Sequence, residues 1–365
     1  MSRAYNFSAG PAALPLEVLQ DAQANLVDYK GTGMSVMEMS HRGKDYDAIH
    51  QEAVATFKEL CGLGDDWSVV FVQGGASMQF AMLPMNFLGA GAVADYASEG
   101  TWSAKALKEA QKVAALRGAT VNVAADCKKD IPVRMPAADE WKWTDGAAYC
   151  HICSNETISG AQLKVFPETA SPLVCDMSSD ILSCERDYSK FAMFYAGAQK
   201  NLGPSGMAVV AIRKDFAAKG TDAIPTMLQY RTYVDENSLY NTPPTWGIYI
   251  FGETMKWVKK MGKENLFAAN KAKAKKIYDT IDSSDFWTGT ALKEYRSDMN
   301  VTWRIKGGDE ALEKKFIDEA KALGMSSLKG HRSVGGIRAS IYNAFPEAGI
   351  DALVSFMKDF EKKNG

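Results

Sequence analysis

Short apolar segments alternate with helical stretches through the first two thirds of the chain, and this alternation constrains the fold more than any other feature. Each segment is apolar at consecutive positions, as strands covered on both faces of a sheet are. Amphipathic helices are predicted between them, for example over residues 45–60 and 103–116. The pattern predicts an α/β fold with a seven-stranded, mainly parallel sheet. The predicted strands are residues 69–72, 92–96, 120–124, 148–153, 173–176, 193–196 and 207–212.

Beyond about residue 260 the pattern changes to long helices and isolated strands. Helices are predicted at 268–281, 310–323 and 350–360, and strands at 300–305 and 337–342. Single cores stop growing at roughly 250–300 residues, so a chain of 365 residues is expected to divide. We predict a large domain over residues 16–260 and a smaller α+β domain made of residues 1–15 and 261–365.

Charge and composition exclude several classes of protein. The net charge of −2 and pI near 6.2 provide no global field that would attract nucleic acid or an anionic membrane. The N-terminal residues lack the apolar run of a secretory signal, and no later segment is long enough to span a membrane, so we expect a cytoplasmic protein. Six cysteines are too few for a disulfide scaffold. Cys150 and Cys153 form a C-x-x-C pattern, but no second pair completes a zinc site, and we predict no metal.

Open α/β sheets bind ligands beyond the carboxyl ends of their strands, and candidate residues follow several predicted strands here. Gly74-Gly75-Ala76-Ser77 follows the first strand and opens a helix, where backbone N–H groups could bind a phosphate; an ordinary turn is the alternative. Asp176 ends another strand, where a buried carboxylate needs a cationic partner unless it caps the next helix. A protonated pyridine nitrogen would serve as that partner.

Two further residues belong to the same set. Lys200 lies among glycines and alanines directly after a strand, where desolvation could lower the proton affinity of its amine, although most lysines are surface charges. Trp102 follows the second strand and could stack on a planar ring, or simply pack in the core. Each signal is weak alone. Their joint order along the chain, each at a strand end, predicts a site for a phosphorylated, planar cofactor.

These residues lie within motifs that resemble the phosphoserine aminotransferase family of the class V, fold-type I pyridoxal-phosphate enzymes. The resemblance runs over nearly the entire chain. The motifs are residues 6–12 (NFSAGPA), 38–43 (EMSHRG), 155–158 (NETI), 196–201 (AGAQKN), 241–245 (NTPPT) and 330–340 (GHRSVGGIRAS).

The resemblance implies that Lys200 carries pyridoxal 5′-phosphate as a Schiff base, that Asp176 binds the pyridine nitrogen and that Trp102 stacks on the ring. It further implies contacts of Thr157 with the phenolic oxygen and of three residues with the phosphate, namely Ala76, Ser77 and Gln199. Asn241 and Thr242 would reach that phosphate from a partner subunit, which implies a homodimer with shared sites.

The basic residues within these motifs indicate the substrate. Arg338 resembles the residue that binds the substrate α-carboxylate, since a planar guanidinium fits a carboxylate. His41, Arg42, His331 and Arg332 resemble a clamp for a second anion, either a phosphate or a side-chain carboxylate; taken singly, each His-Arg pair could be an ordinary surface charge. Some family members carry Ser at the position of Ala9, so only backbone contacts with the substrate are expected there.

The implied reaction is a reversible, ping-pong transamination between O-phospho-L-serine or 3-phosphohydroxypyruvate and glutamate or 2-oxoglutarate, in serine biosynthesis. Two alternatives stay open. Another class V enzyme, such as a serine-glyoxylate aminotransferase or a cysteine desulfurase, would share Lys200 and Asp176 without needing the doubled His-Arg clamp. A binding protein without catalytic activity or a nicotinamide dehydrogenase would need no Schiff base.

Overall fold

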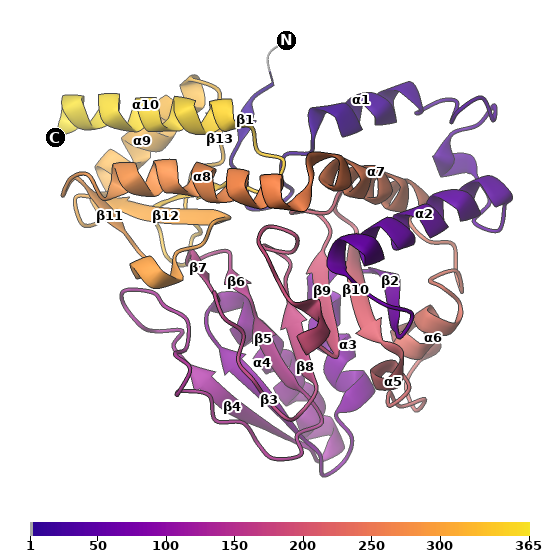
Figure 1. Cartoon of the computed structure of the whole chain (residues 1–365). Coiled ribbons are helices and arrows are strands. Elements are labelled where there is room, and N and C mark those ends of the chain that lie inside the picture. Colours follow the sequence, from indigo (N-terminus) through magenta and orange to yellow (C-terminus); the bar gives the residue numbers. More distant parts are fainter. Residues whose placement is uncertain (1–2) are drawn as a thin grey trace.

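The computed structural model describes residues 3–365, and its centre is one seven-stranded sheet (Figure 1). Strand β10 runs antiparallel to both of its neighbours, β2 and β9, and the other neighbouring strands are parallel. All seven predicted strands are present, so the predicted α/β fold is confirmed. In spatial order the strands are β2 (Trp67–Gln73), β10 (Met207–Arg213), β9 (Met193–Gly197), β8 (Leu173–Asp176), β5 (Cys150–Cys153), β3 (Val93–Ser98) and β4 (Thr120–Asp126).

Each face of the sheet has its own hydrophobic core. Along β2, Val69 and Phe71 pack in one core while Val70 and Val72 pack in the other, as the period of two in a strand requires. Helices α2 (Lys44–Cys61) and α7 (Thr245–Met261) cover the first face. The second face is covered by α3 (Gly75–Phe87), α4 (Thr101–Arg117), α5 (Lys214–Ala217) and α6 (Tyr230–Asp235). This burial on both faces explains why the strands are apolar at consecutive positions.

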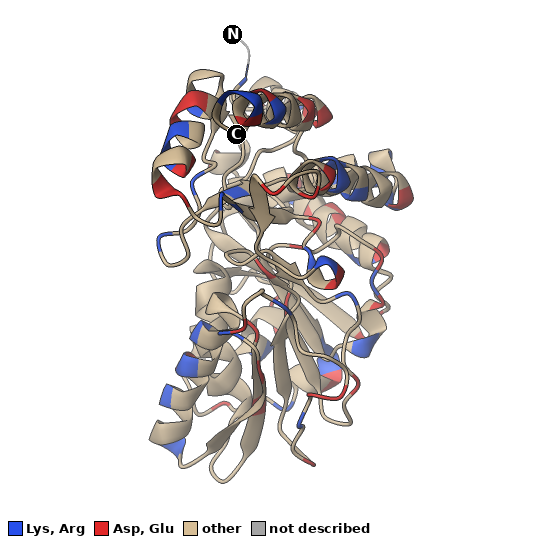
Figure 2. Cartoon of the chain, turned by 90° about the vertical axis from the view of Figure 1, so that its left-hand side faces the viewer, with Lys and Arg blue, Asp and Glu red and all other residues tan. Residues whose placement is uncertain are grey.

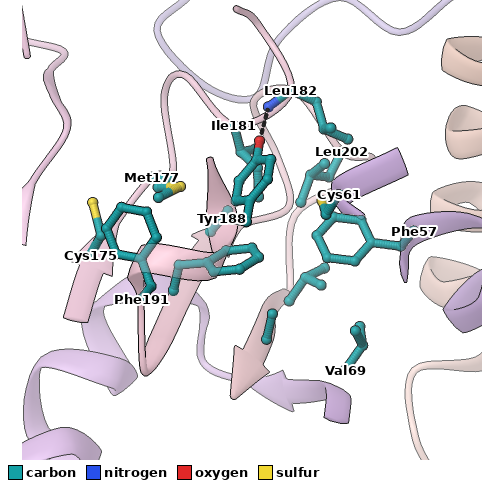
Figure 3. Close-up of a cluster of buried hydrophobic side chains, with 14 of the residues drawn as sticks. Phe57, Cys61, Val69, Cys175, Met177, Ile181, Leu182, Tyr188, Phe191 and Leu202 are labelled. Carbon is teal, nitrogen blue, oxygen red and sulfur yellow. Dashed lines mark hydrogen bonds between the residues drawn. The ribbon is translucent and has the colours of Figure 1, made fainter. Parts of the chain in front are cut away.

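The first of these cores extends beneath the loop that follows β8 (Figure 3). Phe57 and Cys61 from α2 approach Tyr188 and Phe191, and the Tyr188 hydroxyl accepts a hydrogen bond from the backbone N–H of Leu182 at 3.3 Å. Tyr188 belongs to the short 3₁₀ helix η2 (Tyr188–Lys190). The loop after Asp176 is therefore packed onto the rigid sheet rather than left free.

The C-terminal residues form a second packing unit at one end of the sheet (Figure 1). Its core combines Phe7 with apolar residues between 274 and 360. The predicted division at residues 16–260 agrees with this clustering but stays a prediction. The unit contains α8 (Lys263–Ile281), α9 (Glu310–Ala322), α10 (Glu347–Asn364), the antiparallel sheet of β11 (Trp287–Gly289), β12 (Asn300–Ile305) and β14 (Ile337–Ser340), and the pair β1 (Tyr5–Asn6) and β13 (Met325–Ser326).

The remaining short elements connect these units. The pair β6 (Asn155–Glu156) and β7 (Ala161–Gln162) lies beyond the carboxyl end of β5. Helix α1 (Leu16–Ala24) and the 3₁₀ helix η1 (Val36–Glu38) pack with α7 in a fourth, smaller core. The other 3₁₀ helices are η3 (Thr226–Leu228) and η4 (Lys293–Tyr295). Within residues 3–365, no helix is both long and apolar enough to cross a membrane.

Candidate active site

A cavity of about 310 Å³ opens at the carboxyl ends of the central strands. Ser98, Cys153, Asp176 and Gly197 are the last residues of β3, β5, β8 and β9, so the segments that follow these strands converge on it. The volume suits a small molecule with the dimensions of a cofactor. Of the predicted site residues, the cavity is lined by Ala9, Ala76, Ser77, Trp102, Thr157, Asp176, Gln199, Lys200, His331 and Arg338.

One wall of the cavity is the N-terminus of α3. Gly74 precedes the helix in the left-handed conformation (φ 92°), and Gly75 opens it with φ 61°. A Cβ on Gly74 would lie 2.8 Å from the Cβ of Met78, so a larger residue would distort the turn. No side chain caps this helix, so backbone N–H groups in its first turn are available to an anion. The predicted phosphate cradle thus has suitable geometry.

Asp176 also lines the cavity and is 5% exposed. Its Oδ1 accepts hydrogen bonds from the backbone N–H of Ser178 at 2.9 Å and from the Ser178 hydroxyl at 2.6 Å. Burial raises the pKa of the carboxyl, whereas the hydrogen bonds of Ser178 and the charge of Lys200 oppose that rise. Among the described residues Asp176 forms no ion pair, so a cationic group in the cavity would be bound favourably.

Lys200 lines the same cavity. Its Nζ donates a hydrogen bond to the Thr157 hydroxyl at 2.7 Å and lies 5.8 Å from the centre of the Trp102 ring. A Cβ on Gly10 would meet the side chains of Gln199 and Lys200 at 3.5 and 3.6 Å, so the N-terminal segment closes over this lysine. The amine, the hydroxyl and the indole therefore surround one small volume.

The open end of the cavity is basic. Arg338 lies in β14; its Nη1 donates only a long hydrogen bond, 3.4 Å, to the Thr157 carbonyl, and its buried Nε has no partner among the described residues. Burial lowers the pKa of this guanidinium because no carboxylate compensates for the lost hydration. His331 stands beside it, and burial together with the positive charges of Arg338, Arg332 and Lys105 lowers its pKa. This end of the cavity is built to receive an anion.

Five predicted site residues do not line the cavity of the single chain: His41, Arg42, Asn241, Thr242 and Arg332. The first two follow η1, and Asn241 and Thr242 precede α7. The Nε2 of His41 and the Oδ1 of Asn241 are buried without hydrogen-bond partners among the described residues. The His331-Arg332 pair is divided, since His331 lines the cavity and Arg332 is exposed.

Cys150 and Cys153, which could have formed a metal or redox pair, have different surroundings. The Sγ of Cys150 contacts Asp95 and Thr169, whereas Cys153 lines the cavity and its Sγ donates to the Asn155 carbonyl. Residues 3–365 contain no cluster of three or more His, Cys, Asp or Glu side chains that could hold a metal ion.

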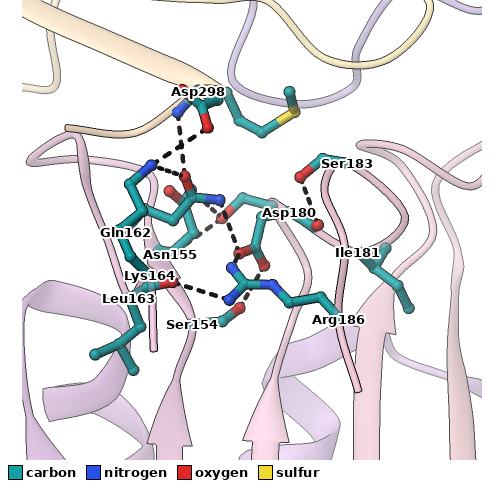
Figure 4. A network of polar contacts seen from close by, with 12 residues as sticks. Ser154, Asn155, Gln162, Leu163, Lys164, Asp180, Ile181, Ser183, Arg186 and Asp298 are labelled. Carbon is teal, nitrogen blue, oxygen red and sulfur yellow. Dashed lines mark hydrogen bonds and ion pairs between the residues drawn. The ribbon is translucent and has the colours of Figure 1, made fainter. Parts of the chain in front are cut away.

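The sequence did not point to several residues that support the site (Figure 4). Asn155 donates to Ser179 and to Asn300, both at 2.8 Å, and thereby joins the β6 segment to the C-terminal sheet. Asp180 forms a buried ion pair with Arg186 at 2.7 Å and also accepts hydrogen bonds from Ser154 and Gln162. The only signal in the sequence for these residues is that they are polar and lie in or near a motif. Most of the residues with which they form hydrogen bonds lie far away in the sequence.

Comparison with known proteins shows the family to which the chain belongs. The family described as aminotransferase class V matches residues 4–353. A phosphoserine aminotransferase of Niallia circulans is 53% identical over 100% of this chain and 99% of its own length, and one of Pseudomonas aeruginosa is 50% identical with the same coverage. This chain belongs to the phosphoserine aminotransferase family of class V aminotransferases.

Solved structures of this aminotransferase family have the same fold. The phosphoserine aminotransferase of Bacillus circulans superposes with a TM-score of 0.94 at 52% identity, covering 100% of this chain and 99% of that chain. A pyridoxal-phosphate-bound phosphoserine aminotransferase from Trichomonas vaginalis has a TM-score of 0.93 at 43% identity, covering 98% and 100%. The chain is thus an enzyme that transfers amino groups with pyridoxal phosphate, and the alternatives of a binding protein and a dehydrogenase are excluded.

The cavity fits this cofactor. The uncapped N-terminus of α3 suits its phosphate, the buried carboxylate of Asp176 suits a protonated ring nitrogen, and Trp102 offers a flat apolar surface. The amine of Lys200 lies within reach of both Thr157 and the Trp102 ring.

Proposed function

We propose that this enzyme transfers the amino group between glutamate and 3-phosphohydroxypyruvate, giving 2-oxoglutarate and O-phospho-L-serine, reversibly and in ping-pong order. The observation that carries the proposal is that Arg338 and His331, basic groups without a carboxylate partner, line the same cavity as Lys200 and Asp176. The reaction would serve serine biosynthesis, and we expect it to take place in the cytoplasm.

The cofactor would be held by residues on three sides. Lys200 would hold its aldehyde covalently, Asp176 its ring nitrogen and Trp102 its ring face, with Thr157 beside the phenolic oxygen. Ala76, Ser77 and Gln199 would contact the phosphate. When bound, pyridoxal phosphate supplies an electron sink that acidifies the α-carbon of an attached amino acid.

The chain's own groups would then direct proton transfer. With substrate bound, the free Lys200 amine would act as the general base that accepts the proton from the substrate α-carbon and would then give that proton up again, so that it ends the transfer unchanged. Thr157, 2.7 Å from Nζ, would hold the amine in position. Asp176, fixed by Ser178, would keep the ring nitrogen protonated, because burial strengthens the attraction between the carboxylate and that cation.

Arg338 would bind the α-carboxylate of both substrates through its guanidinium fork. His331 lies near enough to receive the distal anion, the phosphate of one substrate or the side-chain carboxylate of the other. Arg332, His41 and Arg42 would complete this clamp. At Ala9 the chain has no hydroxyl to offer, and its carbonyl already accepts a hydrogen bond from Tyr342 at 2.7 Å.

We propose that the active form is a homodimer in which the partner subunit supplies four of the five residues missing from the single-chain cavity, namely His41, Arg42, Asn241 and Thr242. Apolar side chains near these residues are exposed, among them Val27 (80%), Met37 (56%) and Tyr240 (51%). They lie on segments that pack around the α1–η1–α7 core, beside His41-Arg42 and Asn241-Thr242. A second copy would cover these side chains and bring the four polar residues to its neighbour's site.

A panel of amino acceptors with glutamate as donor tests the substrate. We expect 3-phosphohydroxypyruvate to exceed hydroxypyruvate and glyoxylate in kcat/KM by orders of magnitude, because only the phosphorylated acceptor fills the distal clamp. Comparable rates for the unphosphorylated acceptors would contradict the proposal and favour another class V activity. Sedimentation of the wild-type protein, with Met37→Glu as a variant of the apolar patch, tests the dimer.

A further inference from the structure

The N-terminal turn of α4 is held by a carboxylate from another part of the chain. Helix α4 begins after Gly100, which has no side chain to cap it. The Glu156 carboxylate takes that place: its two oxygens accept from the Trp102 N–H at 3.1 and 3.2 Å, and Oε1 also accepts from the Ser103 N–H at 2.9 Å. The Ser103 hydroxyl donates to the same oxygen at 3.0 Å. Glu156 therefore caps a helix to which it does not belong.

The backbone around Glu156 is shaped to admit this side chain. A Cβ on Gly100 would lie 2.3 Å from the Glu156 carboxyl carbon, so only glycine leaves room for it. Glu156 is fully buried, and burial raises the pKa of its carboxyl, while the hydrogen bonds from Ser103 and Trp102 at the positive end of the helix oppose that rise. Ser103 completes the turn by accepting the N–H groups of Glu99 and Gly100, both at 2.9 Å.

The residue that this cap fixes is Trp102, the proposed surface for the cofactor ring. The indole N–H of Trp102 has no hydrogen-bond partner among the described residues, so the ring is not oriented through its own polar atom. Lys105, one turn further along α4, places its Nζ 4.2 Å from the ring centre. The position of the ring therefore depends on the backbone of the first turn, which Glu156 holds.

The main chain of Glu156 leads directly to a second residue that lines the cavity. Thr157 follows directly and accepts the hydrogen bond from Lys200 Nζ at 2.7 Å. The antiparallel pairing of Glu156 with Ala161 fixes this segment. A displacement of Glu156 would consequently move both Trp102 and Thr157, which lie 5.8 Å and 2.7 Å from Lys200 Nζ.

We infer that Glu156 is a positioning residue for the amino-transfer reaction, which couples the aromatic surface at Trp102 to the Lys200–Thr157 pair. The inference rests on the proposed function, because it assumes that a cofactor ring lies on Trp102. We expect Glu156 itself to contact neither cofactor nor substrate, because its carboxylate accepts hydrogen bonds from the backbone N–H groups of α4. Its effect should therefore appear in the geometry and rate of the reaction more than in substrate affinity.

The test compares the parent holoenzyme with Glu156→Gln, which keeps one acceptor oxygen, and Glu156→Ala, which keeps none. Glu313→Gln is the matched control. Glu313 is also a buried carboxylate that accepts a backbone N–H, from Ile305 at 3.3 Å, and it forms an ion pair with Arg304 at 2.6 Å, but it lies in the C-terminal unit and does not line the cavity. Far-UV circular dichroism checks that every variant folds, and Glu156→Gln serves if Glu156→Ala does not.

Three readouts are expected to change together. Hydrogen exchange in the peptide spanning residues 99–106 should accelerate about tenfold in Glu156→Ala, the usual effect of losing a helix cap, and by a smaller factor in Glu156→Gln. The cofactor should dissociate more readily and lose most of its induced visible circular dichroism. The kcat should fall about tenfold with less than a twofold change in the KM for glutamate, and Glu156→Ala should exceed Glu156→Gln in each effect.

The possible outcomes separate the two hypotheses. If the parent transaminates phosphorylated substrate and the folded Glu156 variants match it in exchange, cofactor dichroism and kcat, the inference is wrong and the proposed function stands. Equal changes in Glu313→Gln would also overturn it, because they would mean a general loss of stability. A parent that does not use the phosphorylated acceptor would refute the proposed function instead, while the exchange rates would still test the cap.

Discussion

Replacing Glu99 with glutamine should change the pH dependence of stability. Glu99 is 1% exposed, its Oε1 accepts from the Cys153 N–H at 3.3 Å, and its Oε2 has no partner among the described residues. Burial, reinforced by the charge of Glu156, raises the pKa of Glu99 to about 8. The other titratable groups that face it are the buried thiols of Cys153 and Cys127. Near neutral pH the folded protein therefore keeps a proton on Glu99 that the unfolded chain releases.

The sign and size of the effect follow from this difference. Because the pKa is higher in the folded state, Glu99 makes the protein less stable as pH rises between the unfolded value of about 4.5 and the folded value of about 8. Each pH unit within that window costs about 1.4 kcal/mol, and the slope flattens near pH 8. From pH 6 to pH 8 the free energy of unfolding of the parent should fall by about 2 kcal/mol relative to Glu99→Gln, which cannot ionise.

Urea denaturation of the holoenzymes at pH 6, 7 and 8, at one protein concentration, measures this difference. Glu140→Gln is the control: the hydrogen bond from Arg134 lowers the pKa of Glu140 to about 2, so Glu140 is ionised in both states throughout the range. Its stability relative to the parent should not change with pH. A difference between Glu99→Gln and the parent that stays constant within about 0.5 kcal/mol would refute the reasoning, since it would mean that Glu99 titrates alike in both states.

Two further predictions concern the proposed site. Lys200→Ala should fold normally yet show no transamination, and borohydride reduction followed by peptide mass spectrometry should find the cofactor adduct on Lys200 of the parent and none in the variant; turnover at the parent's rate would contradict the assignment. Arg338→Lys should raise the KM for glutamate by about tenfold or more, because a point charge replaces a fork that can bind a carboxylate through two hydrogen bonds. Visible absorbance should show that Arg338→Lys still binds the cofactor, and an unchanged KM would exclude Arg338 as the carboxylate ligand.

The sheet could be predicted from the sequence because its signal is local. Strands covered on both faces leave a continuous apolar run, and residues 207–212 were recognisable in this way although β10 runs antiparallel to its neighbours. The direction of a strand leaves no such local mark. The sequence is equally uninformative about the burial of Lys273, which lies in an ordinary Lys-rich helix. In the structure its Nζ is buried and donates to four backbone carbonyls between Ile341 and Phe345.

The site was predictable where a residue follows its strand directly. Asp176 is the last residue of its strand and Lys200 lies three residues after the end of the next strand, so the sheet itself brings them together. Glu156 lies within the motif of residues 155–158, but the sequence does not reveal its capping role. Its partners at Trp102 and Ser103 are more than 50 residues away. Nothing in the residues next to a carboxylate reveals that it caps another segment's helix.

The residues predicted to bind the second anion of the substrate do not all line the cavity of a single chain. Arg338 and His331 are basic without a compensating carboxylate, which suits one anion, but a substrate with two anionic ends needs a second group of donors. His41 and Asn241 each hold a buried polar atom without a partner, and both lie beside exposed apolar side chains. Unpaired polar atoms and exposed apolar surface are each costly to leave in a lone subunit. A second copy of the chain would resolve both costs at once, which is why specificity for the phosphorylated substrate and dimer formation should be lost together in Met37→Glu.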